Sequence, residues 1–281
     1  MHAVTRFAPS PTGRLHLGHA YSAMLAHDFA RAEGGAFLLR IEDIDPGRAR
    51  AEFVDGIFED LLWLGLEYDG EILYQSERLP LYAEALDRLR GEGLVYPCTC
   101  TRAEIAAEIA ASASAPQGPD GPIYPGTCRG VGDTGKPHCW RLDVGQAAAR
   151  AGPLYWLDDH TEVEAEPGRF GDIVLARKDA PASYHLAVTL DDAAQGVTDI
   201  VRGRDLYAAT DIHRLLQALL DLPTPIYHHH DLIVDAAGER LAKRHNAPTV
   251  AGLRDAGVDP AALVEGMRRG EFPAGYSLAQ A

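Results

Sequence analysis

Residues 7–19 read Phe-Ala-Pro-Ser-Pro-Thr-Gly-Arg-Leu-His-Leu-Gly-His, a loop rich in proline and glycine that leads into a helix predicted from Gly18 to Glu33. The first turn of a helix has N–H groups without intrahelical partners and a partial positive charge, so it can bind phosphate. Gly18 allows a ligand to approach the backbone, and the imidazoles of His16 and His19 can donate hydrogen bonds to phosphate oxygens. Taken alone, the motif also fits a surface turn with incidental histidines.

Strands and helices alternate around this motif. Residues 3–8 are predicted to form a strand, and residues 36–41 form a second one that is almost continuously apolar. Such a strand is typical of a parallel sheet that is covered on both faces, and the alternation predicts an α/β fold. We further expect helices at 49–64, 78–92 and 211–220, strands at 173–176, 183–190, 197–201 and 226–234, and a helical tail.

Composition limits the class of protein. The chain has 281 residues, 46% of them hydrophobic, and a net charge of −15. This charge disfavours indiscriminate nucleic-acid binding, which depends on phosphate neutralisation, but it leaves room for a local basic surface. No apolar run is long enough to span a membrane, and no basic-then-apolar leader is present, so we expect a cytoplasmic protein.

The character of the sequence changes from residue 95 to about residue 168. This stretch contains all four cysteines, which are too few and too clustered for a disulfide scaffold, so we expect an insertion with its own small fold. Cys98-x-Cys100 followed by Tyr124-x3-Cys128 is similar to a structural zinc site, which needs four ligands. On chemistry alone the fourth ligand stays open, since His138 and Cys139 are the more ordinary donors.

Two further motifs offer charged groups to a ligand, and a third does not. Glu42 follows the predicted strand 36–41, and ligands bind at strand ends in open α/β sheets. Lys243 follows a turn, where a mobile ammonium can stabilise negative charge on phosphate. Both residues also fit simple solvated positions. Gly130-x4-Gly135-Lys136 is followed by Pro137 where a P-loop has a hydroxyl, so we interpret it as a plain loop.

Together the motifs resemble the class I aminoacyl-tRNA synthetases, and within them the glutamyl group. Residues 6–13 with 16–19 match that group's opening signature, residues 40–46 match its next block, and residues 241–244 fall where its lysine loop belongs. The resemblance covers about residues 4–250. Because the chain ends soon after the lysine loop, without a large anticodon-binding region, it is similar to the family of glutamyl-queuosine tRNA(Asp) synthetases.

This resemblance implies an enzyme that activates L-glutamate with ATP, without needing tRNA, and transfers the glutamyl group to queuosine in the anticodon loop of tRNA(Asp). It implies one structural Zn²⁺, Mg²⁺ with the ATP, no membrane partner and a monomer. The implied catalytic residues are His16, His19 and Lys243, which with Gly18 also bind ATP. The implied glutamate-binding residues are Arg6, Phe7, Ala8, Pro9, Ser10, Glu42, Tyr184 and Arg202, and the zinc ligands are Cys98, Cys100, Tyr124 and Cys128.

The implied architecture is a Rossmann-like parallel sheet with a small zinc-binding insertion. We expect the two halves of the catalytic domain at 1–94 and 171–235, an acceptor-type zinc-binding insertion at 95–170, and the lysine loop with a short helical tail at 236–281. The lysine loop departs from the family pattern at Arg240 and Ala242. The alternatives are a truncated or discriminating glutamyl-tRNA synthetase that charges a tRNA 3′ end, a non-catalytic tRNA-binding paralogue, and a small-molecule ligase or nucleotidylyltransferase of related fold.

Overall fold

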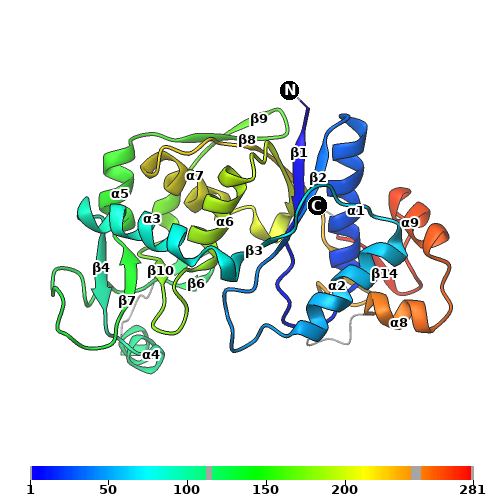
Figure 1. The fold of residues 1–281 in the computed structure, drawn as a ribbon. Helices are drawn as coiled ribbons and strands as arrows, with labels where there is room; N and C mark the ends of the chain where they lie inside the picture. Colours follow the sequence, from blue (N-terminus) through cyan, green and yellow to red (C-terminus); the bar gives the residue numbers. More distant parts are fainter. Residues whose placement is uncertain (1, 112–115, 242–247, 280–281) are drawn as a thin grey trace. The chain divides into compact units, whose positions relative to one another are not determined.

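The computed structural model describes residues 2–111, 116–241 and 248–279 (Figure 1). The chain divides into two compact units, each built from separate pieces of sequence. The first unit comprises residues 1–77, 196–207 and 225–281, and the second comprises residues 78–195 and 208–224. The predicted domain division at residues 94, 170 and 235 stays a prediction.

Parallel strands form the centre of the first unit. Strand β1 (Val4–Phe7) pairs in parallel with β2 (Ala36–Ile41), which pairs in parallel with β3 (Leu73–Tyr74), and β11 (Asp199–Gly203) pairs in parallel with β12 (Ile226–His230). Thr198 lies beside Val4, because its N–H donates to the Val4 carbonyl at 3.0 Å and its hydroxyl accepts the Val4 N–H at 2.8 Å. The predicted α/β fold with a parallel sheet is therefore confirmed.

Helix α1 (Leu17–Ala32) packs along this sheet (Figure 1). Its small and apolar side chains, among them Leu17, Ala20 and Met24, are fully buried. In β2, Phe37, Leu39 and Ile41 are also fully buried, as the continuous apolar pattern predicts for a covered parallel strand. The sheet thus fixes the helix whose first turn contains His16-Leu17-Gly18-His19.

The remaining elements of the first unit follow helix α1 and the later strands. The predicted strand at 226–234 is wrong in one respect: the chain forms β12 and then, after Asp231 and Leu232, a separate strand β13 that pairs antiparallel with β14. The bounds are α2 (Ala51–Leu64), β13 (Ile233–Asp235), α8 (Val250–Asp255), α9 (Pro260–Arg268) and β14 (Tyr276–Leu278).

The second unit combines helices with a small antiparallel sheet. Strand β7 (Cys139–Leu142) lies between β4 (Val95–Cys98) and β10 (Val174–Ala176). The unit also contains two antiparallel hairpins, β5 (Gln117–Gly118) with β6 (Gly121–Pro122) and β8 (Tyr155–Asp158) with β9 (Thr161–Glu164). Its α-helices are α3 (Leu79–Gly91), α4 (Arg102–Ala111), α5 (Val144–Ala151), α6 (Tyr184–Ala194) and α7 (Ala209–Leu219). Within the described residues, no helix is long and apolar enough to cross a membrane.

The strand predicted at 183–190 is wrong, because these residues begin helix α6. Ser183 caps the helix, and its side chain accepts a hydrogen bond from the Leu186 N–H. Residues 186–192 are all buried, the polar Thr189, Asp191 and Asp192 included, so this part of the helix has no exposed face whose polar residues would repeat with a period of 3.6. The alternation of Tyr184, Leu186, Val188 and Leu190 with His185, Ala187 and Thr189 therefore imitated a strand.

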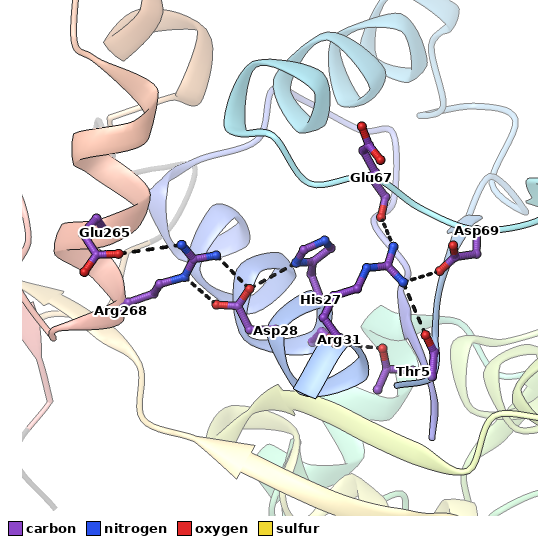
Figure 2. Close-up of polar contacts among 10 residues, drawn as sticks. Thr5, His27, Asp28, Arg31, Glu67, Asp69, Glu265 and Arg268 are labelled. Carbon is purple, nitrogen blue, oxygen red and sulfur yellow. Dashed lines mark hydrogen bonds and ion pairs between the residues drawn. The ribbon is translucent and has the colours of Figure 1, made fainter. Parts of the chain in front are cut away.

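Ion pairs fix both sides of helix α1 within the first unit (Figure 2). On one side, Arg268 of α9 donates two hydrogen bonds to Asp28, at 2.7 and 2.9 Å, and His27 donates a third at 3.1 Å. On the other side, Arg31 donates to Asp69 at 2.7 Å and to the Glu67 carbonyl at 2.7 Å. These contacts connect the helix to segments far away in sequence.

We expect the change Asp28→Asn to destabilise the first unit by about 1 kcal/mol at pH 7, because it removes a charged acceptor of two guanidinium hydrogen bonds. Burial raises the pKa of Asp28, but the hydrogen bonds from Arg268 and His27 outweigh it and hold the pKa below its usual range. The stabilisation is thus present above the unfolded pKa of about 3.9 and lost as pH falls through the lower folded value. Urea denaturation at pH 7 and at pH 3 measures the difference.

The matched control is Asp87→Asn, whose exposed carboxylate pairs with Arg90 one turn away on the same helix. A local pair of this kind contributes less than about 0.5 kcal/mol. Equal losses for the two variants would show that the Asp28 contact stabilises the fold no more than a local exposed pair does.

Candidate functional site

The first turn of α1 is capped by the two histidines of its own motif. The Gly18 N–H donates to His16 Nδ1, and the His16 N–H donates to His19 Nδ1, each at 3.1 Å. The two rings lie 3.7 Å apart between centroids. Because Nδ1 is the acceptor in both rings, the neutral imidazoles have their proton on Nε2.

This cap changes the expected phosphate donors. The Leu17 N–H donates to the Pro248 carbonyl at 3.0 Å, and the His19 N–H donates to the His16 carbonyl at 2.9 Å. The first three backbone N–H groups of the helix therefore already have acceptors within the protein. The sequence predicted both these N–H groups and the imidazoles of His16 and His19 as phosphate donors, and the structure shows that the three N–H groups are engaged within the protein.

Lys243 lies outside the described residues, but both flanks of its segment are described. On the N-terminal side, the Leu241 N–H donates to the Ile233 carbonyl at 3.2 Å. On the C-terminal side, Pro248 accepts from Leu17, and the Val250 N–H donates to the Leu15 carbonyl at 2.9 Å. The segment with the predicted lysine thus ends at the first turn of α1.

The loop after β1 and the end of β2 lie together at the carboxyl ends of these strands. Phe7 and Pro9 are buried, Ala8 is half-buried and Ser10 is exposed. The Glu42 N–H donates to the Pro9 carbonyl at 3.1 Å. Glu42 is also 3.4 Å from Arg40, whose side chain is fully buried. The structure therefore brings together two of the predicted glutamate-binding segments.

Two buried arginines stand on the strands next to this loop. Arg6 of β1 is 5% exposed, and Arg202 of β11 is 4% exposed. Arg202 donates from Nε to His229 Nε2 at 3.2 Å and from Nη2 to the Leu206 carbonyl at 3.1 Å. Its guanidinium lies 5.0 Å from the centre of the Tyr227 ring. The guanidinium is thereby held in one orientation.

The sequence interpretation missed His229 and Tyr227. Register pairs Arg202 with His229 across the parallel strands β11 and β12. The available signal was the run His228-His229-His230 in a predicted strand. Successive side chains of a strand point to opposite faces of the sheet, so this run places imidazoles on both faces. Histidine as a positioning group for Arg202 could have been proposed from that run.

Tyr184 lies in the second unit, in the first turn of α6. Its ring packs against His185 and His213, with centroid distances of 5.5 and 5.6 Å. The sequence placed it on a strand, and the change to a helix moves its neighbours from every second residue to every third or fourth.

Three cysteines and one tyrosine converge in the second unit. The sulfur atoms of Cys98, Cys100 and Cys128 all lie within 4.8 Å of one another. The Tyr124 hydroxyl lies 3.4 Å from Cys98 Sγ and 3.6 Å from Cys100 Sγ, and it accepts the Cys128 N–H at 2.9 Å. Cys139 is outside this group, since its thiol donates to the Cys98 carbonyl.

The donor set suits a metal ion. Burial raises the pKa of the Cys128 thiol, but hydrogen bonds from Tyr124 and Cys100 outweigh it and hold the pKa at about 6. Burial raises the pKa of Cys100 to about 11. These hydrogen bonds favour the thiolate form of Cys128, and a cation among the sulfurs would favour deprotonation of the thiols as well. Three sulfurs and a phenol oxygen supply the four ligands of a tetrahedral site.

Neighbouring residues hold these ligands in place. Arg129, next to Cys128, makes an ion pair with buried Asp172 at 2.6 Å. The guanidinium of Arg141 stacks on the Tyr124 ring at 3.9 Å from its centroid. His138, an alternative donor in the sequence interpretation, instead contacts the Lys136 carbonyl through Nδ1 at 2.9 Å.

The P-loop-like stretch from Gly130 to Pro137 contains turns and no helix, so its interpretation as a plain loop is confirmed. The Gly135 N–H donates to Asp133 Oδ1 at 2.8 Å within this loop.

The sequence matches a protein-family model described as tRNA synthetases class I (E and Q), catalytic domain, over residues 2–277. A Glutamyl-Q tRNA(Asp) synthetase of Rhodobacter capsulatus is 53% identical, over 92% of this chain and 97% of that protein. One of Deinococcus radiodurans is 46% identical, over 91% of this chain and 84% of that protein. A glutamate–tRNA ligase of Citrifermentans bemidjiense is 38% identical, over 92% of this chain and 55% of that protein.

Solved structures show the same fold. The crystal structure of a glutamate–tRNA synthetase from Elizabethkingia anophelis matches with a TM-score of 0.79 and 25% identity. The match covers 98% of this chain and 63% of that one, so the chain spans less than two thirds of this structural relative.

We expect Cys98→Ser to lose most of the bound metal of the purified protein, because it removes one sulfur from the cluster. Cys139→Ser is the matched control, since its sulfur lies outside the cluster, and it should keep the wild-type metal content. Inductively coupled plasma mass spectrometry of the two variants gives metal per chain. Unchanged content in Cys98→Ser would remove this cysteine from the ligand set.

Proposed function

The chain belongs to the class I tRNA synthetases for glutamate and glutamine, and we propose that it activates L-glutamate with ATP and transfers the glutamyl group to queuosine in tRNA(Asp). The observation that supports this most is the 53% identity, over 97% of its length, to a relative named Glutamyl-Q tRNA(Asp) synthetase. The reaction is a ligation that forms an ester.

In this proposal the first turn of α1 binds ATP. His16 and His19 are held by their Nδ1 atoms, so their Nε2 groups can donate to phosphate oxygens. Gly18 keeps the backbone accessible between them. Lys243 is proposed to supply a positive charge to the phosphates, and the described residue Pro248, which follows five positions later, accepts a hydrogen bond from Leu17 in this turn.

Glutamate binds at the carboxyl ends of the strands in this proposal. Arg6 and Arg202 are buried guanidinium groups, which suit bidentate binding of the side-chain carboxylate. Glu42 suits the ammonium group, and Tyr184 completes the set by resemblance. Residues 7–10 form one side of the proposed glutamate site. The hydrogen bond from the Glu42 N–H to the Pro9 carbonyl connects them to the end of β2.

Activation is an in-line displacement. A glutamate α-carboxylate oxygen attacks the α-phosphorus of ATP, the bond to the bridging oxygen breaks, and pyrophosphate leaves with the electron pair. Mg²⁺, when bound with ATP, neutralises phosphate charge. The protein positions the two substrates and stabilises the developing charge with imidazole N–H groups and Lys243.

Transfer forms an ester on the modified base. A hydroxyl of the queuosine cyclopentenediol attacks the acyl carbon of glutamyl-adenylate, its proton is released, and AMP leaves. We also propose that the metal of the second unit is Zn²⁺, bound by Cys98, Cys100, Tyr124 and Cys128 as a structural ion, because the three thiols are preferred zinc donors and the Tyr124 hydroxyl lies beside them as a fourth.

The decisive experiment supplies labelled glutamate and ATP with three forms of tRNA(Asp): one with queuosine, one without it, and one with queuosine but without the 3′ adenosine. Label is expected on the first and third forms only. Label on the queuosine-free form, or the absence of label from the form that lacks the 3′ adenosine, would instead indicate charging of the tRNA 3′ end.

We expect Lys243→Ala to reduce kcat for ATP–pyrophosphate exchange by about 100-fold, because it removes a charge that stabilises the transition state. Glutamate affinity, measured by calorimetry, should change less than about threefold. Parallel losses in both quantities would remove Lys243 from the transition-state role.

A further inference from the structure

A buried carboxylate in the first unit has no part in the chemistry described so far. Asp60 of α2 is fully buried, and its Oδ1 accepts a hydrogen bond from Arg254 Nη1 of α8 at 3.2 Å. The other oxygen, Oδ2, has no hydrogen-bond partner among the residues that the structure describes. Glu59 Oε2 accepts a hydrogen bond from Arg254 Nη2, at 3.2 Å.

Arg14 lies against the same face of α2. A Cβ atom built on Gly56 would lie 2.6 Å from Arg14 Nη1, so the guanidinium lies directly over this glycine. Gly56 and Asp60 are four residues apart and neighbours on the helix surface, and the positive charge of Arg14 acts on the Asp60 carboxyl. Glycine is unfavourable inside a helix, and the close approach of Arg14 explains its presence.

Both arginines belong to segments of the proposed ATP site. Arg14 stands two residues before His16, and Arg254 is on the helix that begins just after Pro248. These segments are also joined directly, since Leu17 donates to Pro248 and Val250 donates to Leu15. Helix α2 is therefore a common support for the histidine motif and for the C-terminal flank of the lysine segment.

We propose that Asp60 is a positioning residue for ATP binding, because its buried carboxylate holds Arg254 by a hydrogen bond and attracts Arg14, which lies over Gly56 on the same helix. The proposal rests on the proposed function. Asp60 itself touches neither substrate; it acts through the two arginines on the segments at residues 14–17 and 248–254.

The cost of burying this carboxylate supports a functional role. Burial raises the pKa of Asp60 to about 6, although Arg254 and Arg14 oppose the rise. The unfolded pKa is about 3.9, so the charged form at neutral pH destabilises the folded state. A charge that lowers stability is unlike a structural ion pair, whose loss would lower stability.

The test uses Asp60→Asn and Gly56→Ala in ATP–pyrophosphate exchange without tRNA. Asp60→Asn removes the charge that pairs with Arg254 and attracts Arg14, and Gly56→Ala displaces Arg14 while favouring the helix. Each variant should raise KM for ATP by roughly tenfold and KM for glutamate by less than about twofold. Their melting temperatures should equal or exceed that of the wild type.

Asp55→Asn and Gly91→Ala are matched controls. Asp55 is exposed on the same helix, and a Cβ atom on Gly91 would meet only open space. Both should retain wild-type KM values. In the wild type, KM for ATP should also rise as pH falls below about 6, whereas in Asp60→Asn this added rise should be absent. The charged groups facing Asp60 are Arg254, Arg14 and Glu59.

Two results would overturn the proposal: an unchanged KM for ATP in both variants, or equal increases for ATP and glutamate with a lower melting temperature, which indicates a structural role. If the wild type shows no exchange, the proposed function fails separately. In that case the dissociation constant of ATP is measured by calorimetry for the wild type and both variants. Equal constants in all three proteins would reject the role of Asp60.

Discussion

The start of helix α1 imposes the constraint on which the first unit depends. Backbone N–H groups in a first turn need acceptors, and here the acceptors are His16 Nδ1, the His16 carbonyl and the Pro248 carbonyl. Because the cap is made by the motif's own rings, helix formation and orientation of the imidazoles are the same event. Pro248 brings a segment more than 200 residues away in sequence to the same turn.

Several charged side chains are buried in the first unit, and burying each of them costs desolvation free energy. Arg6, Arg40 and Arg202 are each at most 5% exposed, on three strands of an otherwise apolar core. Buried charges are expensive unless paired, and Arg40 lies 3.4 Å from Glu42, while Arg202 donates to His229 and to the Leu206 carbonyl. Buried guanidinium groups suit a carboxylate, which is the part that Arg6 and Arg202 play in the proposed binding of glutamate.

Local pattern predicted the elements that carry their own signal. The strands at β1 and β2, the helix after Gly18 and the approach of Cys98, Cys100, Tyr124 and Cys128 follow from short-range spacing or family resemblance. Periodicity failed at 183–190, because a helix buried on all sides has no polar face to reveal its period. His229 was missed because its importance depends on strand register, which only the folded chain defines.

The contact between Arg268 and Asp28 spans 240 residues, whereas the cysteine cluster closes over about 30. Closing a longer loop costs more chain entropy, so contacts between residues far apart in sequence form later than local ones. During synthesis from the N-terminus, the cysteine cluster can therefore assemble while β1 and α1 still await their partners at residues 198 and 268. The histidine motif is therefore translated long before Pro248 and Arg268, whose contacts with α1 can form only near the end of synthesis.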